Sequence, residues 1–146
     1  MEKQILINKV NNSWWWHVPP QDKEAYKKRG KFLASTFAQA EFYGRPNNTP
    51  ERVSISSPLY GFSELEIIKI LFPTEVVAEY EEFAQETLND NDKKGWYERR
   101  IEWDARMHQK TREMGYDAIV LFASNGRKYL EKNKKPHSIE LNLLNT

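Results

Sequence analysis

The alternation of apolar and polar residues divides the chain into a strand-rich front, a helical middle and a strand-rich end. Residues 74–114 carry apolar positions at helical spacing, and the polar cluster at residues 89–92 divides them into two helices. Short apolar runs predict strands at residues 14–18, 32–36 and 117–122, and alternation of apolar and polar residues predicts strands at residues 53–57 and 138–143. Strands separated by unequal loops, with the helices gathered in the middle, predict an α+β fold.

Capping residues predict two shorter helices. Thr36 precedes a helical stretch that reaches Tyr43 and stops at Gly44. Ser63 and Glu66 have the spacing of a capping box, and they precede a helix that runs to residue 71. The remaining polar stretches predict loops at residues 45–50 and 125–135, and either a loop or a short helix at residues 21–29.

Length and composition narrow the classes of protein that fit. With 146 residues, the chain is expected to form a single domain over residues 1–146. Its net charge of +1 gives no general attraction to nucleic acid or to a membrane surface. The absence of cysteine excludes disulfides and thiolate chemistry. No apolar run approaches the ~20 residues of a membrane span, so we expect a cytoplasmic protein without a membrane partner.

Three segments in a fixed order carry candidate chemistry. They contribute a histidine at His17, an aromatic residue at Tyr43 and a carboxylate at Glu140 on the last predicted strand. Taken alone, His17 also fits a buried structural histidine, and Glu140 also fits a strand residue that faces solvent. The three histidines lack the short paired spacing of metal ligands, so no metal centre is expected.

Together these segments resemble the His-Tyr-Glu group of ADP-ribosyltransferases, which includes the poly(ADP-ribose) polymerases. Trp16-His17-Val18 is similar to the group's Trp-His-Gly strand, and Gly30-Lys31-Phe32-Leu33-Ala34-Ser35 is similar to its glycine-lysine-aromatic strand. Tyr43 stands at the position of its helix tyrosine, and Glu140 at that of its catalytic glutamate. The resemblance implies split antiparallel β-sheets around an NAD cleft, with residues 74–114 as a helical insertion packed outside the cleft.

The resemblance also assigns a role to each site residue. His17 would hydrogen-bond the ribose in the adenosine half of NAD, and the backbone of Val18, where the family has glycine, would pair with the nicotinamide amide. Tyr43 would stack on the nicotinamide ring. Glu140 would hold the ribose 2′-hydroxyl and stabilise the positive charge that develops as the nicotinamide–ribose bond breaks. This arrangement requires His17 and Glu140 to face one cleft. If they lay on opposite faces of the domain, a plain interaction module would be the better hypothesis.

Two positions depart from the family pattern in ways that affect the expected contacts. Ala40 stands where the family usually has serine, so Ser35 or Thr36 would supply the remaining contact to the nicotinamide amide. Ser138 stands where arginine-modifying relatives carry an acidic or amide residue, which argues against an arginine acceptor.

The expected function is a mono-ADP-ribosyltransferase that uses NAD as its substrate, without a metal, and modifies a macromolecular target. The small size of the domain is similar to that of phage and bacterial effectors that act on host or defence machinery. This comparison is an analogy and is not based on site residues. Whether the acceptor is a protein or a nucleic acid stays open. Two alternatives also stay open: a catalytically degenerate domain that binds a nucleotide or a partner, and a plain interaction module.

Overall fold

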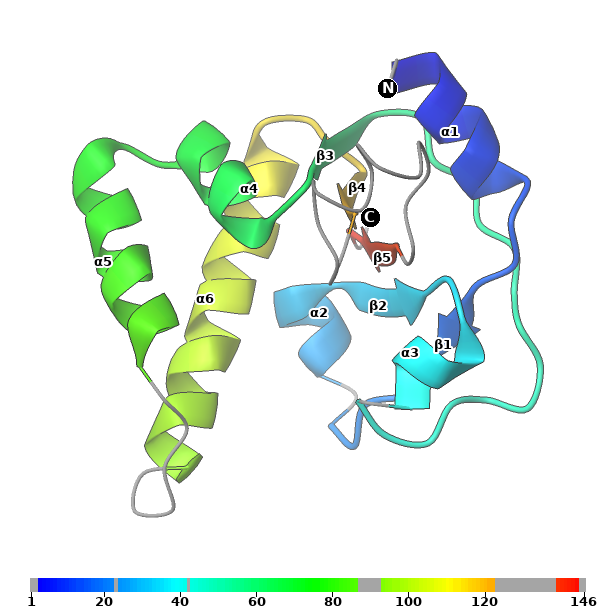
Figure 1. Ribbon diagram of the computed structural model, residues 1–146, viewed down its shortest axis with the longest axis horizontal. Helices are drawn as coiled ribbons and strands as arrows, with labels where there is room; N and C mark the ends of the chain where they lie inside the picture. The colour runs from blue at the N-terminus through cyan, green and yellow to red at the C-terminus, as the bar shows by residue number, and fades with distance from the viewer. Residues whose placement is uncertain (1–2, 23, 42, 87–92, 123–138, 145–146) are drawn as a thin grey trace.

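The computed structural model describes residues 3–22, 24–41, 43–86, 93–122 and 139–144. Within these residues the chain forms one mixed sheet and six helices, which confirms the predicted α+β class (Figure 1). The strands are β1 (Trp16–His17), β2 (Lys31–Ala34), β3 (Pro58–Gly61), β4 (Ala118–Leu121) and β5 (Glu140–Leu143). The helices are α1 (Lys3–Asn11), α2 (Ala25–Arg29), α3 (Phe37–Glu41), α4 (Glu64–Leu71), α5 (Thr74–Gln85) and α6 (Lys93–Glu113). None of these helices is long and apolar enough to cross a bilayer.

The strand order is β1-β2-β5-β4-β3, so the last strand of the chain lies in the centre of the sheet. β5 is antiparallel to both of its neighbours, whereas β3 and β4 are parallel. A parallel pair needs a long crossover connection, which α4, α5 and α6 provide. The described strands therefore form one open mixed sheet rather than the split antiparallel sheets that we expected.

Each face of the sheet has its own apolar core. On one face, α1 packs Leu6 and Val10 against Leu33, Val120 and Leu141 of three neighbouring strands. On the other face, α4, α5 and α6 cover Leu59 and Ile119 and bury an aromatic cluster. This cluster contains Tyr80, Phe83, Trp96 and Trp103. Figure 1 shows α5 and α6 side by side, with α1 at the opposite end of the view.

The prediction of a strand at residues 53–57 was wrong, and hydrogen bonding explains why. The side chain of Asn11 bonds both the N–H and the C=O of Ile55, and the carboxylate of Asp117 accepts from the N–H groups of Ser56 and Ser57. These side chains satisfy the backbone groups that a strand ladder would otherwise use. The strand begins instead at Pro58, where the missing N–H of proline is tolerated at a first position.

The local capping signals were more reliable. Ser63 accepts a hydrogen bond from the backbone N–H of Glu66 at the start of α4, and Thr36 accepts one from Gln39 at the start of α3. α3 ends at Glu41 and is shorter than the stretch predicted to reach Tyr43. α1 was not predicted, although Leu6 and Val10 have helical spacing. The predicted loop at residues 125–135 and the break at residues 89–92 lie outside the described residues.

Candidate functional site

Glu140 lies at the start of β5 and is held by two side chains from the α3 region. The hydroxyl of Tyr43 donates to Glu140 Oε1 at 2.5 Å, and Gln39 Nε2 donates to the same oxygen at 3.5 Å. The Tyr43–Glu140 contact joins residues that are 97 positions apart in the chain. Thr36 positions both donors because it caps α3, and the turn that follows α3 carries Tyr43.

The side of Glu140 that is open to solvent has an aromatic rim. Ala34 of β2 pairs with both Trp16 and Glu140, so all three side chains point to one face of the sheet. Two strand spacings place Trp16 about 10 Å from Glu140. The rings of Trp16 and Phe37 meet edge to face at 5.0 Å, and Tyr43 is 67% exposed. Flat aromatic surfaces of this kind can stack on a planar ligand.

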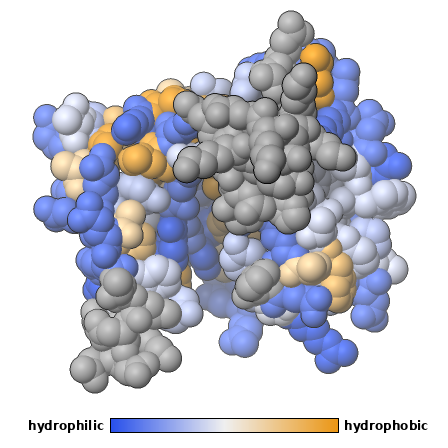
Figure 2. Space-filling view, in the orientation of Figure 1, coloured by the Kyte–Doolittle hydropathy of each residue, from blue (hydrophilic) through white to orange (hydrophobic). Residues whose placement is uncertain are grey.

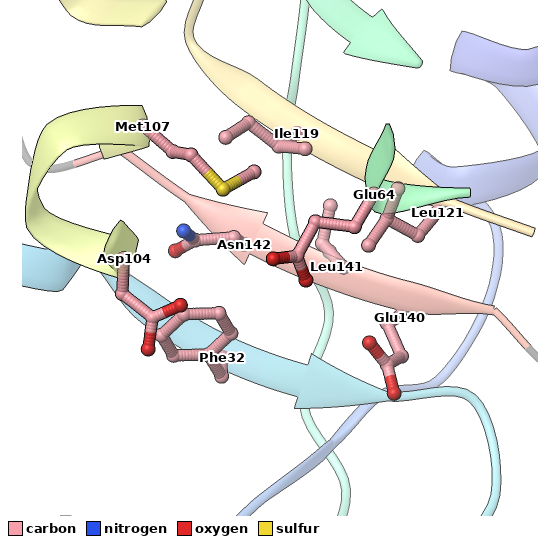
Figure 3. Close-up of a pocket in the computed structure, with 9 residues that line it drawn as sticks. All are labelled: Phe32, Glu64, Asp104, Met107, Ile119, Leu121, Glu140, Leu141 and Asn142. Carbon is pink, nitrogen blue, oxygen red and sulfur yellow. The ribbon is translucent and has the colours of Figure 1, made fainter. Parts of the chain in front are cut away.

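On its other side, Glu140 borders a small hollow between the sheet and α6. The hollow has a volume of about 60 Å³ and contains carboxylates from Glu64 of α4 and Asp104 of α6 as well as Glu140. Figure 3 shows Glu140 at one end of the hollow and Asp104 at the other, with Glu64 between them. The helices of residues 74–114 therefore do not all pack outside the site, as expected from the sequence, because α6 forms one of its walls.

Two arginines neutralise the other carboxylates of the hollow. Arg29 and Arg100 bind opposite oxygens of Asp104 at 2.5 and 2.7 Å, and Arg100 also binds Glu64 at 2.6 Å. Burial by itself would lower the pKa of Arg100, but Asp104 and Glu64 raise it above its ordinary value, so the guanidinium stays charged. Among the described residues Glu140 makes no ion pair, which makes it the one carboxylate of the hollow available to a ligand.

Tyr43 remains a hydrogen-bond donor at neutral pH. Burial of the hydroxyl, followed by the hydrogen bond and the negative charge of Glu140, raises the pKa of Tyr43 above its ordinary value. Although most of its ring is exposed, the hydroxyl end is tucked against Glu140. The phenol therefore orients the carboxylate without competing with it for negative charge.

His17 lies elsewhere, which corrects the expectation that it shares a cleft with Glu140. His17 pairs with Leu33, whereas Glu140 pairs with Ala34, the next residue of β2. Successive residues of a strand point to opposite faces, so the register directs His17 and Glu140 to opposite faces of the sheet. His17 is only 4% exposed. It matches the alternative of a buried structural histidine.

Both ring nitrogens of His17 are bonded within the protein. Nδ1 donates to the backbone oxygen of Phe32 at 2.9 Å, because a carbonyl can only accept, and the hydroxyl of Tyr26 lies 2.8 Å from Nε2. Neither nitrogen is left to bind a ribose unless Tyr26 moves.

The other expected binding residues are largely committed to local structure. The hydroxyl of Ser35 accepts from the N–H of Ile139, and that of Thr36 caps α3. Ala40 is buried in α3. Val18 lies beside the turn that follows Tyr43, because a Cβ on Gly44 would approach its side chain to 2.8 Å. Only Tyr43 and Glu140, of the residues singled out in the sequence, are in direct contact at the site.

Sequence analysis missed Gln39, Glu64, Arg100 and Asp104, which also shape the site. The spacing of four between Arg100 and Asp104 is a detectable helical pair. The contact of Arg29 with Asp104 joins residues 75 positions apart, and no local pattern reveals it. Within the described residues, no group of three or more histidine, aspartate or glutamate side chains is arranged to hold a metal ion.

Comparisons with known proteins give no match: no protein-family model, no curated protein and no solved structure matches this chain.

Proposed function

We propose that this chain is a mono-ADP-ribosyltransferase that takes NAD as its substrate, with Glu140 as the catalytic carboxylate and Tyr43 as its partner. One observation carries the proposal: the hydroxyl of Tyr43 lies 2.5 Å from Glu140 although 97 residues separate them. The family resemblance requires these two residues at one site, and chance folding would seldom bring a chosen pair into hydrogen-bond contact.

The proposed reaction needs one ionised carboxylate. The bond between C1′ of the ribose and the nicotinamide nitrogen breaks, and its electron pair leaves with nicotinamide. Positive charge then develops on the sugar, and Glu140 stabilises it by accepting a hydrogen bond from the 2′-hydroxyl. A nucleophile of the acceptor attacks C1′ and loses its proton. The neutral phenol of Tyr43 keeps Glu140 oriented throughout.

The open, aromatic side of Glu140 suits the nicotinamide end of NAD better than the hollow does. A volume of about 60 Å³ is well below the ~300 Å³ at which small-molecule sites begin. Tyr43, by contrast, offers an exposed ring against the carboxylate, and Phe37 is exposed beside Trp16. The proposal therefore places the reacting ribose at one end of the central strand β5, and it gives His17 no role.

The alternative of a catalytically degenerate binding domain has its own support. His17, Ser35 and Thr36, three residues that would contact NAD in the family pattern, use their polar atoms in internal hydrogen bonds. The position of His17 supports a plain interaction module, because that alternative was expected if His17 and Glu140 did not share a cleft. Among the coloured residues in Figure 2, hydrophilic side chains predominate and apolar ones lie in separate patches, whereas docking faces are usually contiguous.

Labelled NAD tests the proposal. The wild-type protein, incubated with a lysate and NAD labelled in the adenylate phosphate, is expected to transfer label to a macromolecule, and Glu140→Gln is expected to lose at least 100-fold of the rate. Glu102→Gln removes an exposed carboxylate of α6 and serves as the matched control, with labelling unchanged. NAD-dependent thermal stabilisation without any transfer would favour the degenerate binding domain.

A further inference from the structure

A second concave surface lies between α2 and α6, apart from the hollow beside Glu140. Its volume is about 560 Å³, within the range of sites that hold small molecules. α2 contributes Lys27 and Lys28. α6 contributes His108, Gln109, Arg112 and Glu113. We refer to this surface as the α2–α6 groove.

The α2–α6 groove is positively charged. Three cations line it, Lys27, Lys28 and Arg112, against the single carboxylate of Glu113. Lys28 and Arg112 form no ion pair with any residue that the structure describes, and Lys27 makes only a solvent-exposed pair with Glu24 at 3.2 Å. Exposed pairs of this kind exchange readily with other partners. Two or three cations are therefore free to bind an anion.

His108 lines the groove as a buried residue. It is only 2% exposed, and burial followed by the neighbouring charge of Arg112 lowers its pKa, so the ring is neutral near pH 7. The positive charge of the groove therefore comes from its lysines and from Arg112.

We propose that the α2–α6 groove binds the diphosphate or triphosphate group of a small molecule. Lys28 and Arg112 would neutralise the phosphate oxygens from two sides, and the planar guanidinium of Arg112 matches a pair of those oxygens. Lys27 adds a third charge after leaving Glu24, and the neutral ring of His108 lines the groove near Arg112. The volume of the groove fits a nucleotide-sized ligand. This site is independent of the Glu140 chemistry.

Calorimetry at constant ionic strength with inorganic tripolyphosphate, and then with ATP, tests the site without NAD. Both ligands are expected to bind the wild-type chain, and Lys28→Gln with Arg112→Gln is expected to weaken binding at least tenfold. Lys69→Gln with Lys94→Gln removes the same charge from exposed positions outside the groove and should change affinity less than twofold. Equal weakening by both double variants would overturn the proposal, because binding would then depend only on the net charge of the protein and not on the groove.

A second measurement follows His108, which lines the groove without contributing to its charge. The imidazole ¹⁵N resonances of His108 are expected to shift on addition of tripolyphosphate to the wild type and to stay in place in the Lys28, Arg112 double variant. Binding that leaves these resonances unmoved in the wild type would contradict the proposed site. Tighter binding of single-stranded oligonucleotide than of ATP would reject a small-molecule ligand.

Discussion

Replacing Asp104 with asparagine should destabilise the protein strongly, because this one carboxylate joins α2 to α6. Arg29 contributes two hydrogen bonds to Oδ2, at 3.1 and 2.5 Å, and Arg100 contributes two to Oδ1, at 3.1 and 2.7 Å. The side chain of Asp104 is 12% exposed, and those of Arg29 and Arg100 are 28% and 22% exposed. Asparagine keeps the shape of the side chain but removes its charge and turns one acceptor into a donor.

The expected loss lies at the lower end of the range for a buried ion pair. Breaking such a pair costs about 3–5 kcal/mol, while exposed pairs contribute at most about 1 kcal/mol. Because both arginines keep some contact with water, and Arg100 keeps Glu64, we expect Asp104→Asn to lower the free energy of unfolding by about 3 kcal/mol. For a chain of 146 residues, this loss corresponds to a fall in melting temperature of roughly 10 °C.

Urea unfolding followed by circular dichroism measures the effect, with thermal melting as a second readout. Glu79→Gln is the matched control, because the pair of Glu79 with Arg106 is exposed and 3.5 Å long, and its loss should be below about 0.5 kcal/mol. The midpoint should fall for Asp104→Asn while the slope of the transition is unchanged. A loss equal to that of Glu79→Gln would refute the view that Asp104 fastens α2 to α6.

Two further predictions concern backbone conformation and pH. Gly30→Ala should destabilise the protein far more than Gly115→Ala. Both residues have positive φ, but a Cβ at Gly30 would lie 2.3 Å from Asn142 Oδ1, whereas one at Gly115 would meet nothing within 4 Å. Similar unfolding midpoints for the two variants would contradict this prediction. The pKa of Tyr43 is raised on folding, so its hydroxyl contributes stability that is complete below pH ~10, the value in the unfolded chain, and is lost as the pH rises further. Glu140→Gln should lower the Tyr43 pKa in an ultraviolet titration of phenolate absorbance, and an unchanged titration curve would show that the carboxylate is not its partner.

Features of the fold that depend on neighbouring residues could be predicted from the sequence. The caps at Thr36 and Ser63 are short-range hydrogen bonds. The strand Ala118–Leu121 lies in an apolar run, and the strand Glu140–Leu143 lies in an alternating segment. The strand prediction for residues 53–57 was wrong because the hydrogen-bond partners of their backbone groups, Asn11 and Asp117, lie 44 and about 60 positions away. A pattern of neighbouring residues does not reveal such distant partners.

The candidate site, too, could be predicted from the sequence only in part. Tyr43 and Glu140 were expected to share one site, and their side chains are in hydrogen-bond contact. The position of His17 could not be derived, because a shift of one residue in strand register moves a side chain to the other face of the sheet. The arginine network around Asp104 is likewise set by how α2 packs on α6, which sequence alone does not determine.

The proposed catalytic role of Glu140 is tested most directly by the rate at which purified protein releases nicotinamide from NAD, measured by chromatography. Release needs no knowledge of the acceptor, because water can take its place at C1′. We expect measurable turnover by the wild type, at least 100-fold slower release by Glu140→Gln with an unchanged melting temperature, and an intermediate rate for Tyr43→Phe. Equal rates for the wild type and Glu140→Gln, or no release by the wild type at saturating NAD, would contradict the assignment of Glu140 as the catalytic carboxylate.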